Sequence, residues 1–233
     1  MILGTICARA GSKGVPGKNL KLLAGKPLIL HTIDEAKKCK MLDDIIISTD
    51  SEEITNIGKK EGISVPFKRP SDLSSDTAGK WDVFRHALLE YERTSNQTVD
   101  YLVDLDVTAP LKTNEDITSV INFALENPDA DIVYCGYEPE RNPYFTMVEI
   151  NKDGNAMLVK TSETALVRRQ DAPKVYSLSA AVLAIKRDAL LKYDHWTEAK
   201  TKIFPLPRER AIDIDSELDL KIVECLMKIK NSD

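Results

Sequence analysis

The sequence predicts an α/β protein built on a mostly parallel sheet with helices packed against it. Short apolar runs typical of buried strands alternate with segments whose apolar residues recur at helical spacing. This alternation is typical of right-handed βαβ units. The chain has 233 residues, which is enough for one large or two small domains with a sizeable core.

Apolar patterning places the individual elements. The predicted strands are Ile2–Ala8, Asp44–Thr49, Ile63–Phe67, Tyr101–Leu105, Asp131–Tyr137 and Val175–Ile185. The predicted helices are Leu28–Lys40, Glu52–Glu61, Trp81–Arg93, Asn114–Glu126 and Glu217–Lys230. The fourth helix has the clearest pattern, since Thr113 precedes it as an N-cap and Asp116 follows three residues later, as in a capping box. We expect Ser216 to cap the last helix.

The pattern changes after residue 137. Tyr144–Ile150 and Ala156–Thr161 look like short strands around the turn sequence N-K-D-G, which predicts a hairpin. We therefore predict a main domain formed by residues 1–137 and 175–233, and an excursion over 138–174 without a core of its own. Because a lone hairpin is marginal in water, its apolar side chains are expected to be buried against a partner subunit.

A glycine-rich segment, C-A-R-A-G-S-K-G-V-P-G-K-N over residues 7–19, directly follows the first predicted strand. Glycines at a strand end let backbone N–H groups approach an anion closely, and Arg9, Lys13 and Lys18 add positive charge around the turn. The spacing fits neither the P-loop nor the dinucleotide fingerprint. The segment predicts a polyphosphate site, although an ordinary surface loop with solvated charges fits the same residues.

Two aspartates precede the last predicted helix. Asp213 and Asp215 are two residues apart in an extended stretch, so their side chains project to the same side. Paired carboxylates suit Mg²⁺, which takes few protein ligands when phosphate oxygens and water complete its octahedron. Taken alone, the pair also fits a helix cap beside a solvated charge.

Three further polar segments are candidates for the same site. Asp104 and Asp106 follow a strand and can bind metal, accept sugar hydroxyls or cap a loop. Arg69 lies in a turn-rich stretch and can meet a base or a phosphate, while the simpler reading is a surface loop before a helix capped by Asp76 or Thr77. Because ligands bind beyond the carboxyl ends of parallel strands, we place the glycine-rich segment, residues 49–50 and 104–106 on one rim.

Composition excludes several classes. A net charge of −5 does not favour binding to nucleic acid or to an anionic membrane, whereas a local cationic pocket suits a small anionic ligand. The cysteines at 7, 39, 135 and 225 are dispersed, which is typical of a reduced, cytoplasmic protein rather than a disulfide or zinc scaffold. We expect no signal peptide and no membrane span.

With these segments in place, the chain resembles the acylneuraminate cytidylyltransferases, or CMP-sialic acid synthetases, along nearly its whole length. Five blocks match in order: residues 7–19, the strand end I-S-T-D at 47–50, R-P and S-D-T-A within 69–78, R-R-Q-D-A-P at 168–173, and I-D-I-D-S-E-L-D at 212–219. The resemblance implies a Rossmann-like fold, a homodimer, CTP and Mg²⁺ as requirements, and transfer of CMP to a 2-keto sugar acid with release of pyrophosphate. The excursion is then the dimerisation element.

The resemblance also implies residue roles. The residues implied to hold the triphosphate are Arg9, Ser12, Lys13, Gly14 and Lys18, and those implied to face the cytosine are Asn19 and Arg69. Asp213 and Asp215 carry Mg²⁺, and together with Arg9 and Lys13 they form the expected catalytic set. The expected sugar-facing residues are Asp106, Arg168, Arg169, Gln170 and Ser179.

Two departures from the family pattern concern the acceptor. The family commonly reads L-Q-P-T-S-P-L-R where this chain reads L-D-V-T-A-P-L-K over 105–112, and N-G-A where it has Ser179-Ala180-Ala181. Asp106 thus stands in place of a sugar-facing glutamine and must face sugar hydroxyls or amides, a cation such as Lys112, or a second metal. A related nonulosonic acid of the legionaminic or pseudaminic type then suits the site. Alternatives are the octulosonate (KDO) synthetases, whose Q-G-D-E-P block is absent here, an enzyme for a polyol phosphate, and a non-catalytic nucleotide-binding regulator.

Overall fold

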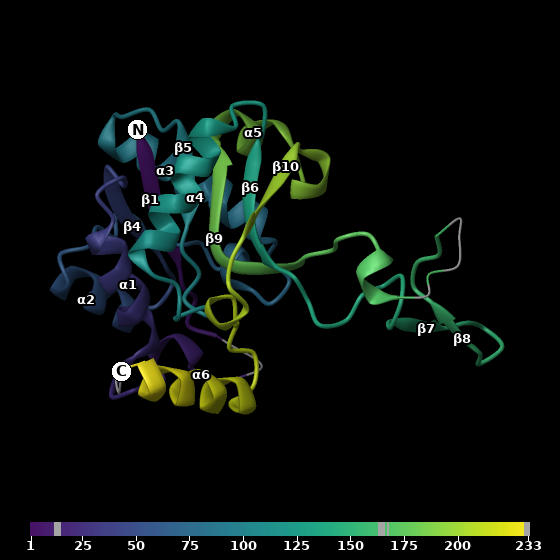
Figure 1. Ribbon diagram of the computed structural model, residues 1–233. Coiled ribbons are helices and arrows are strands. Elements are labelled where there is room, and N and C mark those ends of the chain that lie inside the picture. The colour runs from purple at the N-terminus through teal and green to yellow at the C-terminus, as the bar shows by residue number, and fades with distance from the viewer. Residues whose placement is uncertain (12–14, 163–165, 167, 231–233) are drawn as a thin grey trace.

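A six-stranded sheet with the strand order β10-β6-β9-β5-β1-β4 forms the centre of the molecule in the computed structural model (Figure 1). The structure describes residues 1–11, 15–162, 166 and 168–230. The strands of this sheet are β1 (Ile2–Cys7), β4 (Asp44–Ser48), β5 (Tyr101–Asp104), β6 (Ile132–Tyr137), β9 (Ser177–Lys186) and β10 (Thr201–Pro205). Two short pairs complete the strands: β2 (Leu22–Leu23) with β3 (Lys26–Pro27), and β7 (Val148–Ile150) with β8 (Ala156–Leu158).

The sheet is mostly parallel, as the sequence predicts. β1 pairs in parallel with both β4 and β5, and β6 pairs in parallel with β10. β9 runs antiparallel between β5 and β6. The chain enters β9 from the end of the sheet at which β6 finishes, because Tyr137 and Ser177 pair opposite each other.

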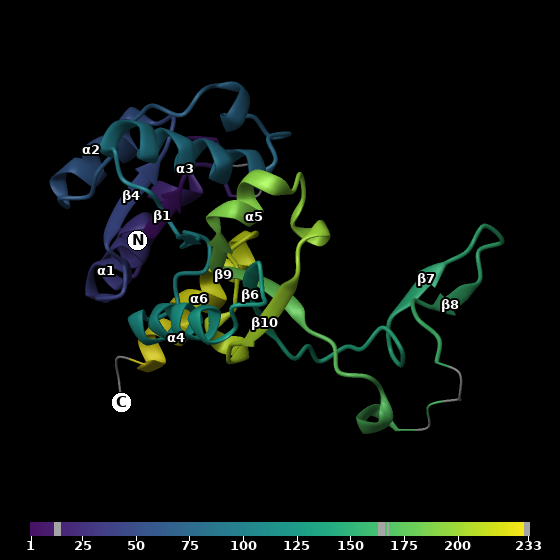
Figure 2. The same cartoon turned by 90° about the horizontal axis from the view of Figure 1, so that it is seen from above.

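Helices cover both faces of the sheet, which gives a Rossmann-like architecture. They are α1 (Leu28–Lys38), α2 (Glu52–Lys60), α3 (Lys80–Ser95), α4 (Asn114–Glu126), α5 (Arg187–Lys192) and α6 (Glu217–Lys230). Figure 2 shows α3 and α5 on one side of the sheet and α1, α4 and α6 on the other. Each side has its own buried apolar cluster, one around Phe84 and Leu88 of α3 and the other around Ile33 of α1 and Ile117 of α4.

Local sequence signals explain several helix ends. Thr113 accepts a hydrogen bond from the backbone N–H of Asp116, whose carboxylate accepts one from the backbone of Thr113, so the predicted capping box is confirmed. Ser216 likewise accepts from the backbone N–H of Asp219 at the start of α6, as predicted. The alternative interpretation of the loop before the third helix has Asp76 or Thr77 as its cap, but α3 begins at Lys80 after Gly79, so neither residue caps it.

The predicted strand over Ile63–Phe67 is also wrong. Ser64 makes an isolated parallel bridge to Ile46 of β4, and the segment forms no strand. Gly62 before it has a positive φ of 74°, and Pro66 within it has no backbone N–H to donate to a neighbouring strand. Ile63 is nevertheless buried, so its apolar signal reflects packing rather than strand pairing.

The excursion over residues 138–174, called the arm from here on, extends away from the main domain (Figures 1 and 2). Its β7–β8 hairpin is confirmed, although both strands are shorter than predicted. Asn151 closes the turn by accepting hydrogen bonds from the backbone N–H groups of Asp153 and Asn155. Apolar side chains of the arm are exposed to between 41 and 67 %, namely Met147, Val148, Ile150, Met157, Leu158 and Val159.

None of the helices in the described residues has the length and apolar character needed to cross a membrane.

Candidate nucleotide-sugar site

Three loops meet at the carboxyl ends of β1, β4 and β5, which confirms the predicted rim. The backbone N–H of Ala10, after β1, donates to Oδ1 of Asp50, after β4, over 2.8 Å. Asn19 stabilises the loop from its other side by donating to the carbonyl oxygen of Arg9 over 2.9 Å. Gly17 has a φ of 64°, a backbone conformation that other residues adopt less readily, and it precedes a short 3₁₀ turn that starts at Lys18.

These loops enclose a cavity of about 250 Å³. Polar residues from the glycine-rich segment, from the stretch before and at the start of α3, and from the loop after β5 line it: Arg9, Lys18, Asn19, Arg69, Ser75, Asp76, Lys80, Asp106 and Thr108. Apolar side chains of Leu73, Val83 and Phe84 form one wall. The cavity therefore combines cationic groups with an apolar surface, as an anionic ligand with a ring system requires.

Predicted nucleotide-binding cations come together here, each already held by an oxygen. Arg9 pairs with Asp76 over 2.8 Å, and Lys18 donates to the carbonyl oxygen of Ile214 over 2.6 Å and to Asp215 over 3.2 Å. Arg69 is 5 % exposed and donates from Nε to Oγ of Ser48 over 3.0 Å. These contacts fix the direction of each side chain before any ligand binds. Ser12, Lys13 and Gly14 lie outside the described residues.

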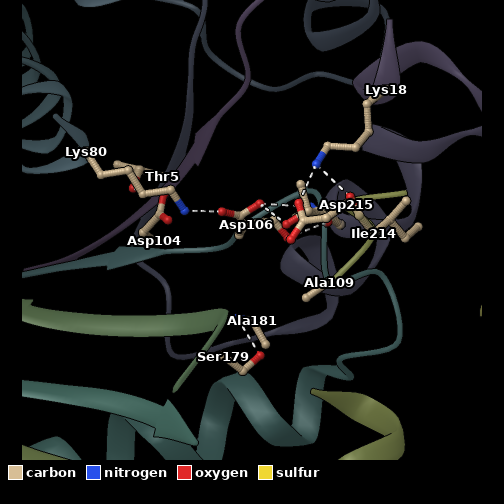
Figure 3. A network of polar contacts seen from close by, with 12 residues as sticks. Thr5, Lys18, Lys80, Asp104, Asp106, Ala109, Ser179, Ala181, Ile214 and Asp215 are labelled. Carbon is tan, nitrogen blue, oxygen red and sulfur yellow. Dashed lines mark hydrogen bonds and ion pairs between the residues drawn. The ribbon is translucent and has the colours of Figure 1, made fainter. Parts of the chain in front are cut away.

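The predicted metal-binding aspartates lie next to this cavity, through the contact of Lys18 with Asp215 (Figure 3). The side chain of Asp215 is 81 % exposed, whereas Oδ1 of Asp213 is buried and accepts no hydrogen bond from the described part of the chain. Burial, together with the charges of Asp106 and Asp215, raises the pKa of Asp213 to about 6.

A buried oxygen without a donor is costly unless a cation or a donor reaches it. The described residues hold no group of three or more His, Cys, Asp or Glu side chains arranged as a preformed metal cage. Mg²⁺ does not need such a cage, because it usually takes one or two carboxylates and completes its shell with water and substrate phosphate. The oxygens of Asp213 and Asp215 therefore fit Mg²⁺.

Asp106 is 8 % exposed and is paired with a cation that sequence reasoning did not predict. Its Oδ2 accepts a hydrogen bond from Lys80, the first residue of α3, and its Oδ1 accepts two from Thr108 over 2.8 Å each (Figure 3). Burial alone would raise the pKa of Asp106, but the charge of Lys80 and these hydrogen bonds lower it to about 2. Asp106 is therefore ionised and compensated.

Lys112, the cation expected to compensate Asp106, is fully buried and contacts the backbone of Asp106 rather than its carboxylate. Its ammonium donates to the carbonyl oxygen of Asp106 over 2.5 Å, to that of Ala109 over 3.0 Å and to Oγ1 of Thr32 over 2.9 Å. It ties the loop after β5 to α1 and so positions the Asp106 side chain. Burial lowers the pKa of Lys112 to about 8, although the nearby carboxylates oppose the shift.

Asp104 lies at the end of β5, near the ion pair between Lys80 and Asp106, and is 2 % exposed. Burial raises its pKa to about 7, against the charge of Lys80 and with the charge of Asp106 adding to the rise. An unfolded aspartate titrates near 3.8. The folded chain thus holds the proton of the Asp104 carboxyl group more tightly than the unfolded chain does. The resulting contribution to the free energy of unfolding is complete below about pH 4 and is lost as the pH rises to about 7.

Replacing Asp104 by asparagine is expected to remove this pH-dependent loss. The Asp104→Asn variant should have a Tm close to that of the wild type at pH 4.5 and a higher one at pH 8, with a gain of at most about 4 kcal/mol in the free energy of unfolding. Thermal melts of both proteins in matched buffers measure this. A difference in Tm that is the same at both pH values would contradict it.

The remaining predicted sugar-facing residues lie outside the cavity. Ser179 is 1 % exposed and donates its hydroxyl hydrogen to the carbonyl oxygen of Ala211 over 3.0 Å. Arg168 lies on the arm, where it forms an ion pair with Asp171 over 2.9 Å. Gln170 lines a separate hollow at the base of the arm. The side chain of Arg169 is outside the described part of the molecule.

A larger hollow of about 500 Å³ lies between α1, the start of α4 and α6. Its charged side chains are largely paired with one another, as in the ion pairs Lys26–Asp34 and Lys38–Glu35. None of the described residues that line it belongs to the glycine-rich segment. Chemistry rather than size therefore identifies the smaller cavity as the candidate site.

Known proteins are similar to this chain over nearly its whole length. The chain matches the family described as Cytidylyltransferase over residues 3–226. Post-translational flagellin modification protein B of Campylobacter coli is 42% identical over 230 residues, which cover 99% of this chain and 96% of that protein. The CMP-N,N'-diacetyllegionaminic acid synthase of Campylobacter jejuni is 41% identical over 230 residues, again with 99% and 96% covered.

The fold is shared with a solved structure of more distant sequence. A CMP:2-keto-3-deoxy-manno-octonic acid synthetase complexed with CTP has a TM-score of 0.71 to this chain at 18% identity, and the match covers 98% of this chain and 99% of the other. The likeness thus extends over the arm as well as the sheet.

Proposed function

The chain belongs to the cytidylyltransferase family, and from this we propose that it couples CTP to a 2-keto sugar acid of the nonulosonic type to give a CMP-sugar and pyrophosphate. The observation that supports this most directly is the cavity at the rim, where the cations of Arg9, Lys18 and Arg69 lie beside the carboxylates before α6. Relatives named as synthetases of CMP-nonulosonic acids support the same reaction.

The nucleotide fits the side of the cavity formed by the glycine-rich loop. Arg9 and Lys18 offset the negative charge of the triphosphate, and we place Ser12, Lys13 and Gly14 against the same phosphates. Arg69 and Asn19, which are held in place by Ser48 and by the backbone of Arg9, are then directed toward the cytosine. The apolar wall of Leu73, Val83 and Phe84 provides a surface for the ring.

Mg²⁺ is the proposed cofactor, with Asp213 and Asp215 as its protein ligands. When bound, it neutralises phosphate charge and stabilises the leaving pyrophosphate. Lys18 bridges the two parts of the site, because it contacts both the loop before α6 and the nucleotide side. The buried Oδ1 of Asp213, which accepts no hydrogen bond from the residues that the structure describes, supports this assignment.

In the proposed reaction a hydroxyl oxygen of the sugar acid bonds to the α-phosphorus of CTP in line with the leaving group. The bond from that phosphorus to the bridging oxygen breaks, pyrophosphate leaves with the electron pair, and the hydroxyl proton passes to water. The chain contributes positive charge where negative charge accumulates in the transition state, from Arg9, which its ion pair with Asp76 holds in place, and from Lys13, as the family resemblance implies. Such preorganised electrostatic contacts account for a large part of the rate in comparable sites.

Release of pyrophosphate from CTP tests this function. The purified chain is incubated with CTP, Mg²⁺ and one acceptor at a time: N-acetylneuraminate, a diacetylated legionaminic acid, a pseudaminic acid, KDO or a polyol phosphate. We expect turnover with nonulosonic acids and the highest kcat/KM with a diamino-dideoxy acid. Turnover with the polyol phosphate alone, or CTP binding without turnover on any acceptor, would contradict the proposal.

We also propose that the enzyme is a cytoplasmic homodimer in which the arm forms the interface. The exposed apolar side chains of β7 and β8 need a partner surface, and a protruding two-stranded hairpin is marginal alone. Arg168, Arg169 and Gln170 then lie on an element that can reach the site of the other subunit. The four free cysteines fit a reducing compartment.

The dimer gives a direct prediction. Light scattering at micromolar concentration should give twice the chain mass, and a double substitution of exposed arm residues, Val148→Asp with Ile150→Asp, should give the single chain mass with little change in far-ultraviolet circular dichroism. Val148 and Ile150 are 56 and 67 % exposed in the single chain, so the charges cost the monomer little. A wild-type monomer at this concentration would contradict the assignment.

A further inference from the structure

The ion pair between Lys80 and Asp106 crosses the cavity from α3 to the loop after β5. Lys80 is the first residue of α3, where the partial positive charge of the helix end disfavours a cation. Helix stability therefore does not account for a lysine at this position. Its ammonium is instead directed at Asp106 (Figure 3). Both residues line the cavity with Arg9 and Lys18.

The pair has unused hydrogen-bonding capacity on the cavity side. An ammonium has three N–H donors, and within the described residues Asp106 is the hydrogen-bond partner of Lys80. Oδ1 of Asp106 is occupied by two donors from Thr108, whereas Oδ2 receives one hydrogen bond from Lys80 and can accept a second. The pair thus offers donors and an acceptor side by side, with a net charge of zero.

This combination matches a sugar acid better than a triphosphate. The phosphates carry acceptor oxygens only, so they have no use for the lone pair of Asp106 and are repelled by it. A sugar acid carries a carboxylate, which accepts from an ammonium, and hydroxyl or amide groups, which donate to a carboxylate. The side chain of Lys80 is 59 % exposed, so it is accessible to such a ligand.

We propose that Lys80 and Asp106 act as one recognition element for the acceptor: the Lys80 ammonium binds the sugar carboxylate, and Oδ2 of Asp106 accepts a hydrogen bond from an N–H or O–H group of the sugar. This inference rests on the proposed cytidylyltransferase function and assigns the acceptor side of the same site. Each residue depends on the other, because either one alone leaves an uncompensated charge beside the substrates.

A double-mutant cycle tests the pair. The variants are Lys80→Gln, Asp106→Asn and the combination of both, which keeps the site neutral and retains donors and acceptors. Each single variant should raise the KM for the sugar acid by roughly tenfold or more, the size expected for one charged hydrogen bond, while calorimetric CTP binding changes by less than about threefold. The double variant should lose less than the product of the single losses.

A matched control is available at the opposite edge of the sheet. Lys202 and Asp129 form an ion pair over 2.8 Å at the amino end of β10, away from the cavity. Lys202→Gln and Asp129→Asn should leave the KM for the sugar acid and calorimetric CTP binding unchanged. If Asp106→Asn does not fold, Lys80→Gln carries the test, since its exposed side chain is not part of the core.

The outcomes separate the inference from the proposed function. A wild-type chain that turns over no sugar acid overturns both. A wild type that turns over a sugar acid, with single variants unchanged in acceptor KM, overturns the inference alone. Single variants that weaken CTP binding as strongly as acceptor use also overturn it, because the pair then serves the nucleotide. If the rise in acceptor KM of the double variant equals the product of the rises in the two single variants, this contradicts the claim that the two residues act together.

Discussion

Replacement of Asp213 by asparagine is expected to lower kcat by about 10²–10³-fold with no loss of folding, because it removes a proposed ligand of Mg²⁺ and with it positive charge that would offset phosphate charge in the transition state. Its Oδ1 is buried without a donor in the described chain, and burial together with Asp106 and Asp215 already raises its pKa to about 6. A neutral side chain of the same shape therefore costs the ligand-free protein little. Steady-state pyrophosphate release and thermal melts measure the two effects.

A binding measurement separates the metal from other causes. The manganese ion is paramagnetic, so titration of the ligand-free protein and of its CTP complex by electron paramagnetic resonance reports metal binding without turnover. We expect Asp213→Asn to weaken binding strongly and Asp215→Asn to do so as well. The control Asp129→Asn, at the opposite edge of the sheet, should bind as the wild type does. Unchanged activity and metal binding in both site variants would remove these aspartates from the site.

The second large effect is expected from Lys112→Met. The change leaves the carbonyl oxygens of Asp106 and Ala109 and the hydroxyl group of Thr32 without their buried donor. Each unsatisfied group costs about 1–3 kcal/mol, part of which is offset because the buried ammonium itself is unfavourable. We expect a loss of about 3 kcal/mol in the free energy of unfolding, which lowers the Tm by about 6–12 °C in a chain of this size.

The same change should also disturb the acceptor side, because Lys112 positions the loop that carries Asp106. The KM for the sugar acid should rise while CTP binding stays close to the wild-type value. Lys202→Met, which removes a more exposed ammonium, should cost less than about 1 kcal/mol. A Tm for Lys112→Met within 2 °C of the wild type, by the same scaling, would mean that the loop repacks without this lysine.

Where the local sequence carries both a helical apolar period and a capping motif, the first and last residues of the helix were predictable. α4 has a helical apolar period and a capping box, and its predicted bounds are those observed. β10 was missed because Thr201–Pro205 places only Ile203 and Phe204 between polar neighbours and a proline, and its position is fixed by pairing with β6. The direction of β9 was not predictable either, since an apolar run is the same for a parallel and an antiparallel strand.

Some residues of the candidate site were likewise predictable from local sequence, and others were not. Arg9, Lys18 and Asp215 lie within recognisable motifs, and the structure brings them together. Lys80 was missed because its partner Asp106 is 26 residues away and the two meet only through the packing of α3 beside β5. Lys80 directly precedes the predicted helix Trp81–Arg93, and a lysine at a helix N-terminus, where the local electrostatics disfavour it, was the one available signal.

The base of the arm has a consequence for how such enzymes diversify. Tyr137 at its start and Ser177 at its end are paired neighbours on adjacent antiparallel strands, the geometry of an ordinary hairpin base. The residues between them are in effect an insertion into a hairpin turn. The length of this insertion does not change the pairing of β6 with β9. The arm can therefore be lengthened, exchanged or reduced to a tight turn during evolution or by design while the strands of the sheet keep their register.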